Sequence, residues 1–371
     1  MKKRIIFLLV VLIVISCSSD KKYKVREVDG VKIFHNKKPS NTDLKINLKE
    51  LFTIPATSEN DSASFSNGTI LTVDKNEDIF ILDTADGRVL RFDRNGKFIK
   101  SFGKKGMGPG EVQYPGGIAC SNNKIYVAEQ LGRKIVVFDY DGKYLKTITS
   151  DNGMPDNFIA LDDGKFVGIE FGYRKEKSKE VDELKFTLYD SSFTATKLID
   201  QKDIIFDPND MEDAYLAFQR YAANSKGFFL STTETDNYQI KFFDFEGNEK
   251  YRIKKGYISI PYSKEEIKSL KRWISRTANI EVTNLKNRYK YAVEALYTDG
   301  KNRVWAVNQW EGDIPDSTSF SIFEEGVFLK EVKLKLPLGK FTKITFVLSF
   351  NKNRIYVLNK TDMYLKVYSI Y

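Results

Sequence analysis

The chain has 371 residues, of which 42% are hydrophobic and 29% are charged, a balance that indicates a globular protein rather than a disordered one. Its two cysteines exclude a disulfide framework, and its single histidine, His35, excludes a zinc site or catalytic centre that needs two imidazoles. The formal net charge of +9 is compatible with nucleic acid or an anionic membrane surface as a partner.

The first 17 residues have the organisation of an export signal. Lys2, Lys3 and Arg4 are followed by an apolar run that is too short to span a bilayer comfortably but matches the core of a secretory signal. The run ends in Val-Ile-Ser-Cys at Cys17, which resembles a bacterial lipobox. The resemblance implies cleavage before Cys17 and its acylation, and several acyl chains anchor stably because each buried methylene contributes about 0.8 kcal/mol. The alternative is an ordinary signal peptide with an incidental cysteine.

Cleavage after residue 16 removes three positive charges, which lowers the formal charge from +9 to +6. Export and the thin spread of the remaining charge argue against nucleic acid as a partner. Ser18 rather than aspartate follows the cysteine, so we expect a lipid-anchored protein of the outer membrane, on its periplasmic or surface leaflet, if the cell is Gram-negative. Residues 17–43 are polar and include His35, and we expect them to be a solvated tether between the lipid and the folded body.

The rest of the chain, residues 44–371, contains a repeat of four short strands with period-2 alternation. In the clearest copies the third strand ends in Phe-Asp, and Asn95-Gly96 and Asp141-Gly142 supply the turn that follows. The second strand of each copy starts at residues 79, 125, 166, 228, 304 and 355. Four antiparallel strands repeated in this way predict a β-propeller, and six copies predict six blades.

The two ends of the repeat region are incomplete in complementary ways. The sixth copy stops after its third strand, at residues 364–371, whereas residues 45–54 have a strand pattern without a blade of their own. We expect this N-terminal strand to supply the missing outer strand of blade six, because that closes the ring and pairs an otherwise open edge.

The segment from Phe102 to Ala119, FGKKGMGPGEVQYPGGIA, followed by IYVAE and IVVFD, resembles an NHL repeat. It is also similar to the six-bladed propeller lipoproteins of Bacteroidota-like bacteria. Residues 68–148 carry the resemblance, and the other four copies share only the strand pattern. The resemblance implies an all-β, NHL- or TolB-like six-bladed propeller and says little about function. Glu129 and Gly132 stand where such repeats usually carry Asp and Asn.

The loops of a propeller divide into two sets because the strands of a blade alternate in direction. First-to-second and third-to-fourth turns lie on one face, and here they are short. Second-to-third connections and the links between blades lie on the other face, which receives all five long insertions: residues 103–115, 172–183, 200–218, 254–291 and 308–318. Long loops in a compact domain are usually functional or mobile. We therefore expect this face, around the mouth of the central channel, to be the interaction surface.

The longest insertion is expected to contain a helix within about residues 262–290, because Ser263 and Glu266 form a capping box before a partial apolar stripe. The helix would lie across the channel mouth as a lid or pack on a blade edge. Aromatic and basic side chains on this face form the candidate ligand-binding set: Tyr114, Tyr173, Arg174, Trp273, Arg276 and Trp310. Simpler alternatives are a solvated loop at Tyr173 and Arg174, and packing of Trp310 under a neighbouring loop.

Three other patterns are weaker. Four carboxylates could bind calcium, although their spacing fits no EF-hand and such loops are usually only solvated: Asp207, Asp210, Glu212 and Asp213. The glycines of residues 106–110 lack the features of a phosphate-binding loop and are expected to permit a tight crossover between blades. Cys120 falls in an apolar strand pattern and is expected to be a buried, inert thiol. We expect no metal, cofactor or catalytic set.

The sequence favours a binding or scaffold module, a lipid-anchored envelope propeller that presents its loop-rich face to a protein, peptide or glycan. The alternative is a lactonase- or lyase-like enzyme that uses carboxylates or a metal at the channel mouth. Some NHL-like lyases rely on a metal held by histidines, and the single His35 weighs against that alternative. A purely structural envelope subunit is a third possibility.

Overall fold

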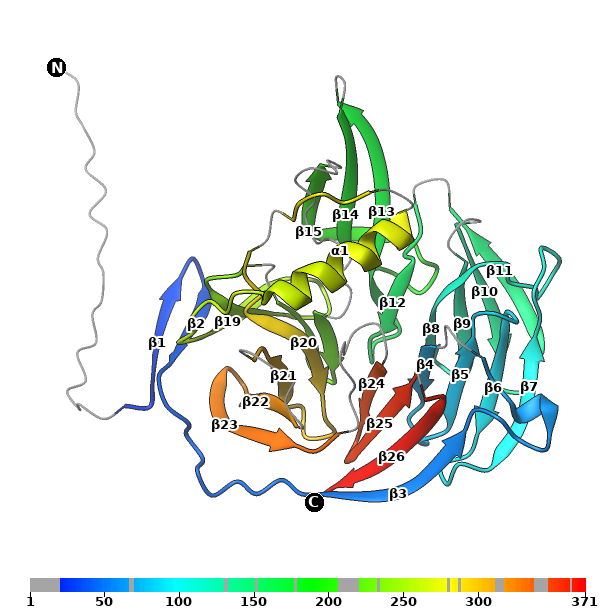
Figure 1. The fold of residues 1–371 in the computed structure, drawn as a ribbon, viewed down its shortest axis with the longest axis horizontal. Coiled ribbons are helices and arrows are strands. Elements are labelled where there is room, and N and C mark those ends of the chain that lie inside the picture. The colour runs from blue at the N-terminus through cyan, green and yellow to red at the C-terminus, as the bar shows by residue number, and fades with distance from the viewer. Residues whose placement is uncertain are drawn as a thin grey trace.

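Six β-sheets form a ring around a central axis (Figure 1). This computed structural model describes residues 21–66, 70–129, 133–150, 153–176, 179–205, 220–231, 234–278, 281–285, 288–310, 317–336, 346–360 and 362–371. Within each blade the neighbouring strands pair in antiparallel fashion, from the innermost strand outwards. The predicted six-bladed, all-β propeller is confirmed.

The first three blades each contain four consecutive strands. Blade one contains β4 (Ile70–Val73), β5 (Ile79–Asp83), β6 (Arg88–Phe92) and β7 (Phe98–Gly103). Blade two contains β8 (Pro115–Ser121), β9 (Lys124–Glu129), β10 (Lys134–Asp139) and β11 (Tyr144–Thr149). Blade three contains β12 (Asn157–Ala160), β13 (Phe166–Glu176), β14 (Lys179–Tyr189) and β15 (Ala195–Ile205). The long strands β13 and β14 project beyond the ring (Figure 1), so the predicted 172–183 insertion is mostly an extended hairpin.

The other three blades include the additions to the basic plan. Blade four contains β16 (Tyr221–Asn224), β17 (Gly227–Ser231), β18 (Tyr238–Phe243) and β19 (Glu249–Lys255). Blade five contains β20 (Val293–Thr298), β21 (Val304–Asn308), β22 (Thr318–Glu324) and β23 (Val327–Leu334). Blade six contains β24 (Phe346–Asn351), β25 (Arg354–Asn359), β26 (Tyr364–Ile370) and, from the N-terminal part of the chain, β3 (Leu48–Pro55).

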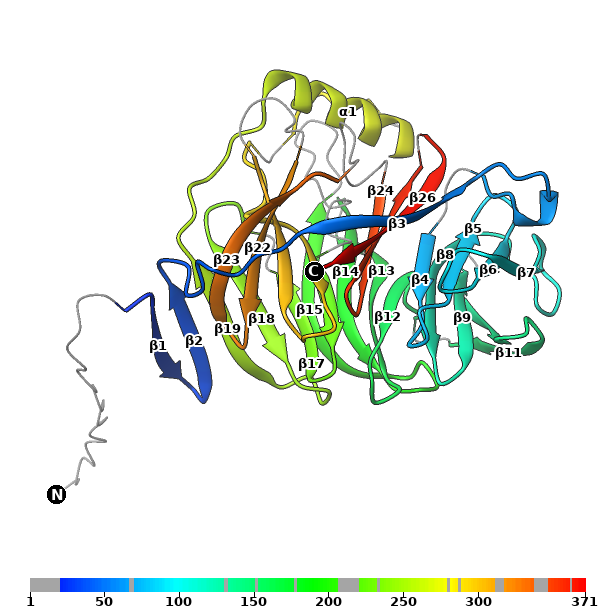
Figure 2. The same cartoon turned by 90° about the horizontal axis from the view of Figure 1, so that it is seen from below.

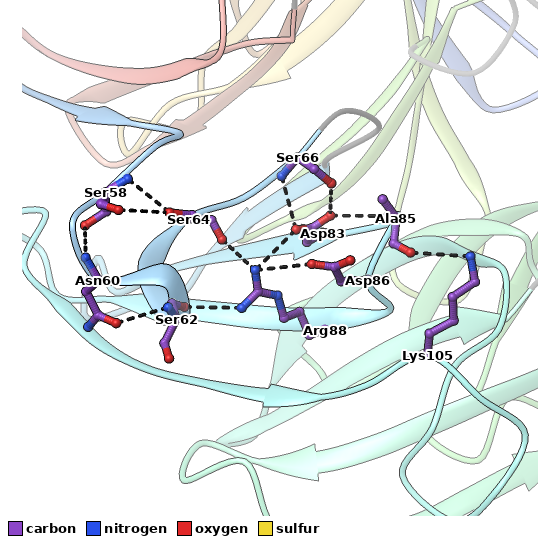
Figure 3. Close-up of polar contacts among 10 residues, drawn as sticks. All are labelled: Ser58, Asn60, Ser62, Ser64, Ser66, Asp83, Ala85, Asp86, Arg88 and Lys105. Atoms are coloured by element: carbon purple, nitrogen blue, oxygen red, sulfur yellow. Dashed lines mark hydrogen bonds and ion pairs between the residues drawn. The ribbon is translucent and has the colours of Figure 1, made fainter.

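The ring closes as predicted, because β3 pairs antiparallel with β26. The link from β3 to blade one contains a short 3₁₀ helix, η1 (Asp61–Ala63), and is fixed by polar contacts (Figure 3). Ser66 donates to the buried Asp83 carboxylate from its backbone N–H at 3.1 Å and from its hydroxyl at 2.8 Å. Arg88 donates to the carbonyl of Ser64 at 2.7 Å. These contacts attach the closing segment to blade one as well as to blade six.

The prediction that residues 17–43 form a solvated tether is wrong from Tyr23 onward. β1 (Tyr23–Val28) and β2 (Val31–Asn36) form a hairpin, and β2 pairs in parallel with β19 at the outer edge of blade four. Asp29 and Gly30 have φ angles of 52° and 78°, the left-handed conformations that a two-residue hairpin turn requires. His35, expected in solvent, is half-buried in β2, and burial together with the nearby positive charges lowers the pKa of its imidazole.

After the hairpin the chain continues along the rim of the disc (Figure 2). Ser40 and Asn41 donate backbone hydrogen bonds to the carbonyls of Phe328 and Leu329 in β23, at 2.9 and 3.0 Å. The N-terminal segment therefore runs along blades four, five and six in turn before the ring closes.

Aspartates organise the turns between third and fourth strands. In blades one to four an aspartate side chain accepts the backbone N–H four residues later, at 2.7–2.9 Å: Asp93, Asp139, Asp190 and Asp244. Glycine stands three residues after this aspartate in blades one, two and four, whereas Phe193 takes the same left-handed conformation in blade three, with a φ of 62°. At Gly142 the φ is +76° and a Cβ would lie 2.5 Å from the Cβ of Phe102, which explains the glycine. These turns are compact, so they add no long insertion to the short-turn face of the disc.

The hydrophobic core lies between neighbouring blades. In one cluster Leu82 and Val89 of blade one pack with Ile125 and Val127 of blade two. The helix α1 (Lys264–Ala278) lies within the predicted 262–290 insertion, on one face of the ring over blades three and four (Figures 1 and 2). No helix among the described residues is both long enough and apolar enough to cross a bilayer.

Candidate functional site

The innermost strands of the blades begin on the loop-rich face, around the central axis of the ring (Figure 1). These strands start at Pro115, Asn157 and Tyr221 in blades two, three and four. The Tyr221 hydroxyl donates to Oδ1 of Asn157 at 3.1 Å. Blades three and four are therefore joined by a polar contact where their innermost strands begin.

Three of the five insertions are linked through two consecutive residues, Lys290 and Tyr291. Lys290 is 2% exposed, and its ammonium group donates to Glu266 of α1 at 2.6 Å and to the carbonyl of Trp310 at 2.9 Å. The next residue, Tyr291, contacts a third insertion. The ammonium group of Lys202, near the end of β15, lies 5.8 Å from the centroid of the Tyr291 ring. The contacts are consistent with the prediction from strand direction that these insertions share one face.

Glu266 has two structural roles in this arrangement. One carboxylate oxygen accepts the backbone N–H of Ser263 at 2.8 Å, and Ser263 Oγ in turn accepts the backbone N–H of Glu266 at 3.2 Å. These reciprocal bonds form the predicted capping box. The other oxygen binds Lys290, so the start of α1 is tied to the beginning of blade five.

A buried guanidinium lies beside this cluster. Arg220 immediately precedes β16 and is 1% exposed, and its guanidinium carbon lies 3.5 Å from the centroid of the Tyr291 ring. Its three guanidinium nitrogens are buried, and none has a hydrogen-bond partner among the described residues. This residue was not predicted from the sequence, since a single arginine before a strand belongs to no recognisable motif.

Two carboxylates with raised pKa values lie in blade three, close to the residue at which its innermost strand β12 begins. The pKa of Asp156 is raised to about 6, mainly by burial and to a smaller extent by the nearby Glu170 carboxylate, while the hydrogen bond from the backbone N–H of Phe171 opposes the shift. Burial also raises the pKa of Glu170, whose Oε2 accepts a hydrogen bond from the Tyr189 hydroxyl at 3.2 Å. A carboxyl group that titrates near pH 6 can exchange protons at physiological pH. This pair was not identified from the sequence.

The six predicted ligand-binding residues have different environments and lie on several elements. Tyr114 and Tyr173 are 48% and 58% exposed, and Arg276 on α1 is also exposed. Arg174 forms ion pairs with Glu183 at 2.6 Å and Asp203 at 2.7 Å across the β13–β15 sheet.

The two tryptophans of the set are packed. Trp273 packs against a small cluster formed by Ile274, Val282 and Leu285, and Trp310 packs on Lys290, with 4.9 Å from the ammonium nitrogen to the ring centroid. For Trp310 the structure therefore shows the packing that was the simpler alternative.

The glycine-rich segment of residues 106–110 folds around a side chain of its own loop. The backbone N–H of Gly108 donates to the Glu111 carboxylate at 2.9 Å, and Lys104 forms an ion pair with the same carboxylate at 2.9 Å. Gly106 has a φ of +156°, a backbone conformation that residues other than glycine rarely adopt. The loop is thus closed on a carboxylate and has no phosphate-binding geometry.

Neither a metal site nor the lipid attachment site can be placed. No group of three or more metal-ligating side chains occurs in the described part of the chain. The acidic segment of residues 207–213 and Cys17 both lie outside the described residues.

The short-turn face has a cavity of about 290 Å³ between blades four and five. It is lined by turn residues such as Asn224 and Asn302 and is bounded at the rim by Lys32 and Phe34 of β2. Lys226 in its wall already forms an ion pair with Glu325. This cavity is a second location that a binding experiment on the loop-rich face must control for.

The comparisons with known proteins agree with the fold. The family described as "6-bladed beta-propeller" (DUF5128) matches residues 57–206, less than half of the chain. No curated protein matches the sequence.

Solved structures are similar only in fold. A Bacteroides fragilis protein named as exported is 13% identical, with a TM-score of 0.51, and the alignment covers 91% of this chain and 99% of that one. A DUF4221 family member from Bacteroides vulgatus is 12% identical, with a TM-score of 0.50 and coverage of 88% and 98%. Virginiamycin B lyase from Staphylococcus aureus is 10% identical over 88% and 99%, with a TM-score of 0.44, and has no bearing on function here. This chain is thus a six-bladed β-propeller.

Proposed function

We propose that the protein is a lipid-anchored propeller of the cell envelope that binds a ligand or partner through its loop-rich face. The observation that carries this proposal is the contact between separate insertions on that face: Lys290 joins α1 to the β21–β22 connection, and Tyr291 contacts Lys202 and Arg220. The opposite face has compact turns organised by aspartates. Binding sites in propeller-like discs are built from such additions because the blades themselves provide a rigid support.

Lipid attachment at Cys17 is the second part of the proposal. It is supported by the lipobox-like sequence and by the position of β1, which begins at Tyr23 and leaves only a short connection after the cysteine. The exchange Cys17→Ala should leave the protein unprocessed or soluble, as measured by membrane fractionation and by metabolic labelling with palmitate. Membrane partitioning equal to that of the parent protein would refute the lipid anchor.

The binding role is tested by recovering partners from envelope membranes. The tagged protein is isolated after mild cross-linking, and the co-purified material is identified by mass spectrometry. A double exchange of exposed residues, Tyr173→Ala with Arg276→Ala, should reduce recovery of the partner, whereas Asn95→Ala and Asn123→Ala in the short turns should not. Loss of recovery with Lys301→Ala at the short-turn cavity, and not with the double exchange, would overturn the proposal.

A carboxylate enzyme is the second candidate function, and one observation favours it. Asp156 and Glu170 both have pKa values raised by burial, as a general acid requires. His35 cannot take part, because it lies in β2 at the rim of blade four. Hydrolysis or elimination that is abolished by both Asp156→Asn and Glu170→Gln, in a screen of lactones and glycosides, would establish this activity instead.

A further inference from the structure

Arg220 is the most unusual charged group in the described part of the chain. It is 1% exposed, and its three guanidinium nitrogens lack hydrogen-bond partners there. A buried cation without a partner is strongly unfavourable, because desolvation of the charge is not offset by an ion pair or hydrogen bonds. The same chain shows the usual solution at Arg303, which is 6% exposed and donates to Asp299 at 2.6 and 2.7 Å.

The surroundings of Arg220 are cationic and aromatic. Its guanidinium lies on the ring of Tyr291, and the ammonium group of Lys202 lies 5.8 Å from the centroid of the same ring. The α1 helix on this face carries five basic residues and two glutamates, and one of these, Glu266, is already bound to Lys290. The aromatic ring stabilises the cation in part, but no group in the described part of the chain accepts a hydrogen bond from its N–H donors.

We propose that Arg220 is the receptor for one anionic group, a carboxylate or a phosphate, of the ligand that the loop-rich face binds. This inference rests on the proposed function and specifies the chemistry of its ligand. A guanidinium presents a planar set of donors that matches both anions in bidentate fashion. Because Arg220 is enclosed, the group that pairs with it must be small, which favours an acidic sugar, an acidic side chain or a phosphorylated molecule over a flat anionic surface.

The chain itself contains a competing partner. Four carboxylates occur in residues 207–213, which lie outside the described residues: Asp207, Asp210, Glu212 and Asp213. If one of them neutralises Arg220, the protein does not need an external anion. An internal partner and an external anion predict opposite effects on stability when the arginine charge is removed in the absence of phosphate and acetate. Stability falls if the chain supplies the partner, and it does not fall if the partner is external.

The test is thermal unfolding of the full chain and of Arg220→Met, with sodium phosphate, sodium acetate or sodium chloride at equal ionic strength. We expect phosphate or acetate to raise the melting temperature of the parent by about 2 °C at a tenfold excess over Kd, and to leave Arg220→Met unchanged. The phosphate and acetate arms distinguish the two anions. In chloride, Arg220→Met should be at least as stable as the parent, because an unpaired buried charge has been removed.

Two control variants show what an unchanged anion response and the loss of a true ion pair look like in the same assay. Arg272→Met, an exposed exchange on α1 outside the candidate binding set, should retain the anion-dependent rise. Arg303→Met should be destabilised in every salt, because it leaves the buried Asp299 carboxylate without its ion-pair partner. If Arg220→Met is instead destabilised in chloride as Arg303→Met is, and no anion stabilises the parent, the chain supplies the partner and the proposal is wrong.

Arg220→Lys keeps the charge but loses the bidentate donor set, and it serves if Arg220→Met does not fold. It should retain less than half of the anion-dependent rise, and equilibrium dialysis with the anion that raises the melting temperature, phosphate or acetate, should find one anion per parent molecule. An undiminished rise, or the absence of both bound phosphate and bound acetate, would refute the proposal. Recovery of partners from envelope membranes distinguishes failure of this inference from failure of the proposed function. Equal recovery by the parent and by Arg220→Met would refute only the role of Arg220 as anion receptor. Recovery of no partner by either protein would refute the binding role of the loop-rich face.

Discussion

The ammonium nitrogen of Lys290 lies 4.9 Å from the centroid of the Trp310 ring and donates a hydrogen bond to the Trp310 carbonyl at 2.9 Å. Lys290 lies near the end of the helical insertion, three residues before the first strand of blade five. Trp310 lies two residues after the second strand of that blade. The pair therefore fixes the insertion to the propeller. An aromatic residue that was expected to contact a ligand is used in this way to position α1.

Trp310→Ala should destabilise the protein and loosen the insertion. A desolvated cation–aromatic contact contributes about 2 kcal/mol, and removal of the ring also leaves the buried Lys290 less well covered. Urea unfolding should show a loss on the order of 2–3 kcal/mol, and limited proteolysis should become faster within residues 262–290. Tyr173→Ala is the matched control, because that ring is 58% exposed and its loss should change stability by less than about 0.5 kcal/mol. Equal behaviour of the two variants would contradict this assignment.

Removal of the closing strand should be far more damaging than removal of the hairpin at the rim. Deletion of residues 45–54 leaves the edge of β26 open and exposes the side chains that pack on Ile54, which is 5% exposed. We expect a loss on the order of 5 kcal/mol and concentration-dependent aggregation, measured by calorimetry and light scattering. Deletion of residues 21–38 removes β1 and β2 but keeps the closure, so it should cost much less. Similar melting temperatures for the parent and the 45–54 deletion would show that closure is not needed.

The blades could be predicted from sequence because their pattern is local. Alternating strands and Asp-x-x-Gly turns placed the second strands to within one residue of the observed β5, β9, β13, β17, β21 and β25. The β1–β2 hairpin was missed although Asp29-Gly30 is a hairpin signal, because three of the six residues of the exposed edge strand β1 are charged and its two valines are also exposed. Such a composition is also typical of a solvated tether.

The site was less predictable because its contacts join segments far apart in sequence. The partners of Arg174 and Trp310 are Asp203 and Lys290, at separations of 29 and 20 residues that no periodic pattern indicates. The burial of Arg220 depends on how blades four and five meet, which its neighbours in sequence do not encode.

The thiol of Cys120 should be unreactive in the native protein. Burial raises its pKa, so the nucleophilic thiolate is scarce at neutral pH, and the side chain packs against the core between blades one and two. In a Cys17→Ala chain, where Cys120 is the only cysteine, iodoacetamide should react more than about a hundredfold more slowly than in guanidinium chloride. Rapid labelling of the folded protein would mean that this blade interface opens.

Asp156 should make the stability of the protein depend on pH between about 4 and 7. Its pKa is raised from 3.8 to about 6 in the folded state, so the folded protein binds the proton more tightly than the unfolded chain does. The stabilising contribution of the neutral carboxyl is therefore complete below pH 4 and is lost as the pH rises through 6. Asp156→Asn keeps an acceptor for the backbone N–H of Phe171 while it removes the charge.

We expect Asp156→Asn to raise the free energy of unfolding by on the order of 1–2 kcal/mol at pH 7.5 and to have no effect at pH 4, as measured by urea unfolding at both values. Asp203→Asn is the control of opposite sign, because hydrogen bonds from Arg174 and Gln201 lower the pKa of Asp203 to about 2. Its exchange should slightly destabilise the protein at pH 7.5. An Asp156→Asn effect of equal size at pH 4 and 7.5 would show that the buried carboxylate is not the cause, whereas disappearance of the effect at pH 4 would identify its ionisation as the destabilising event.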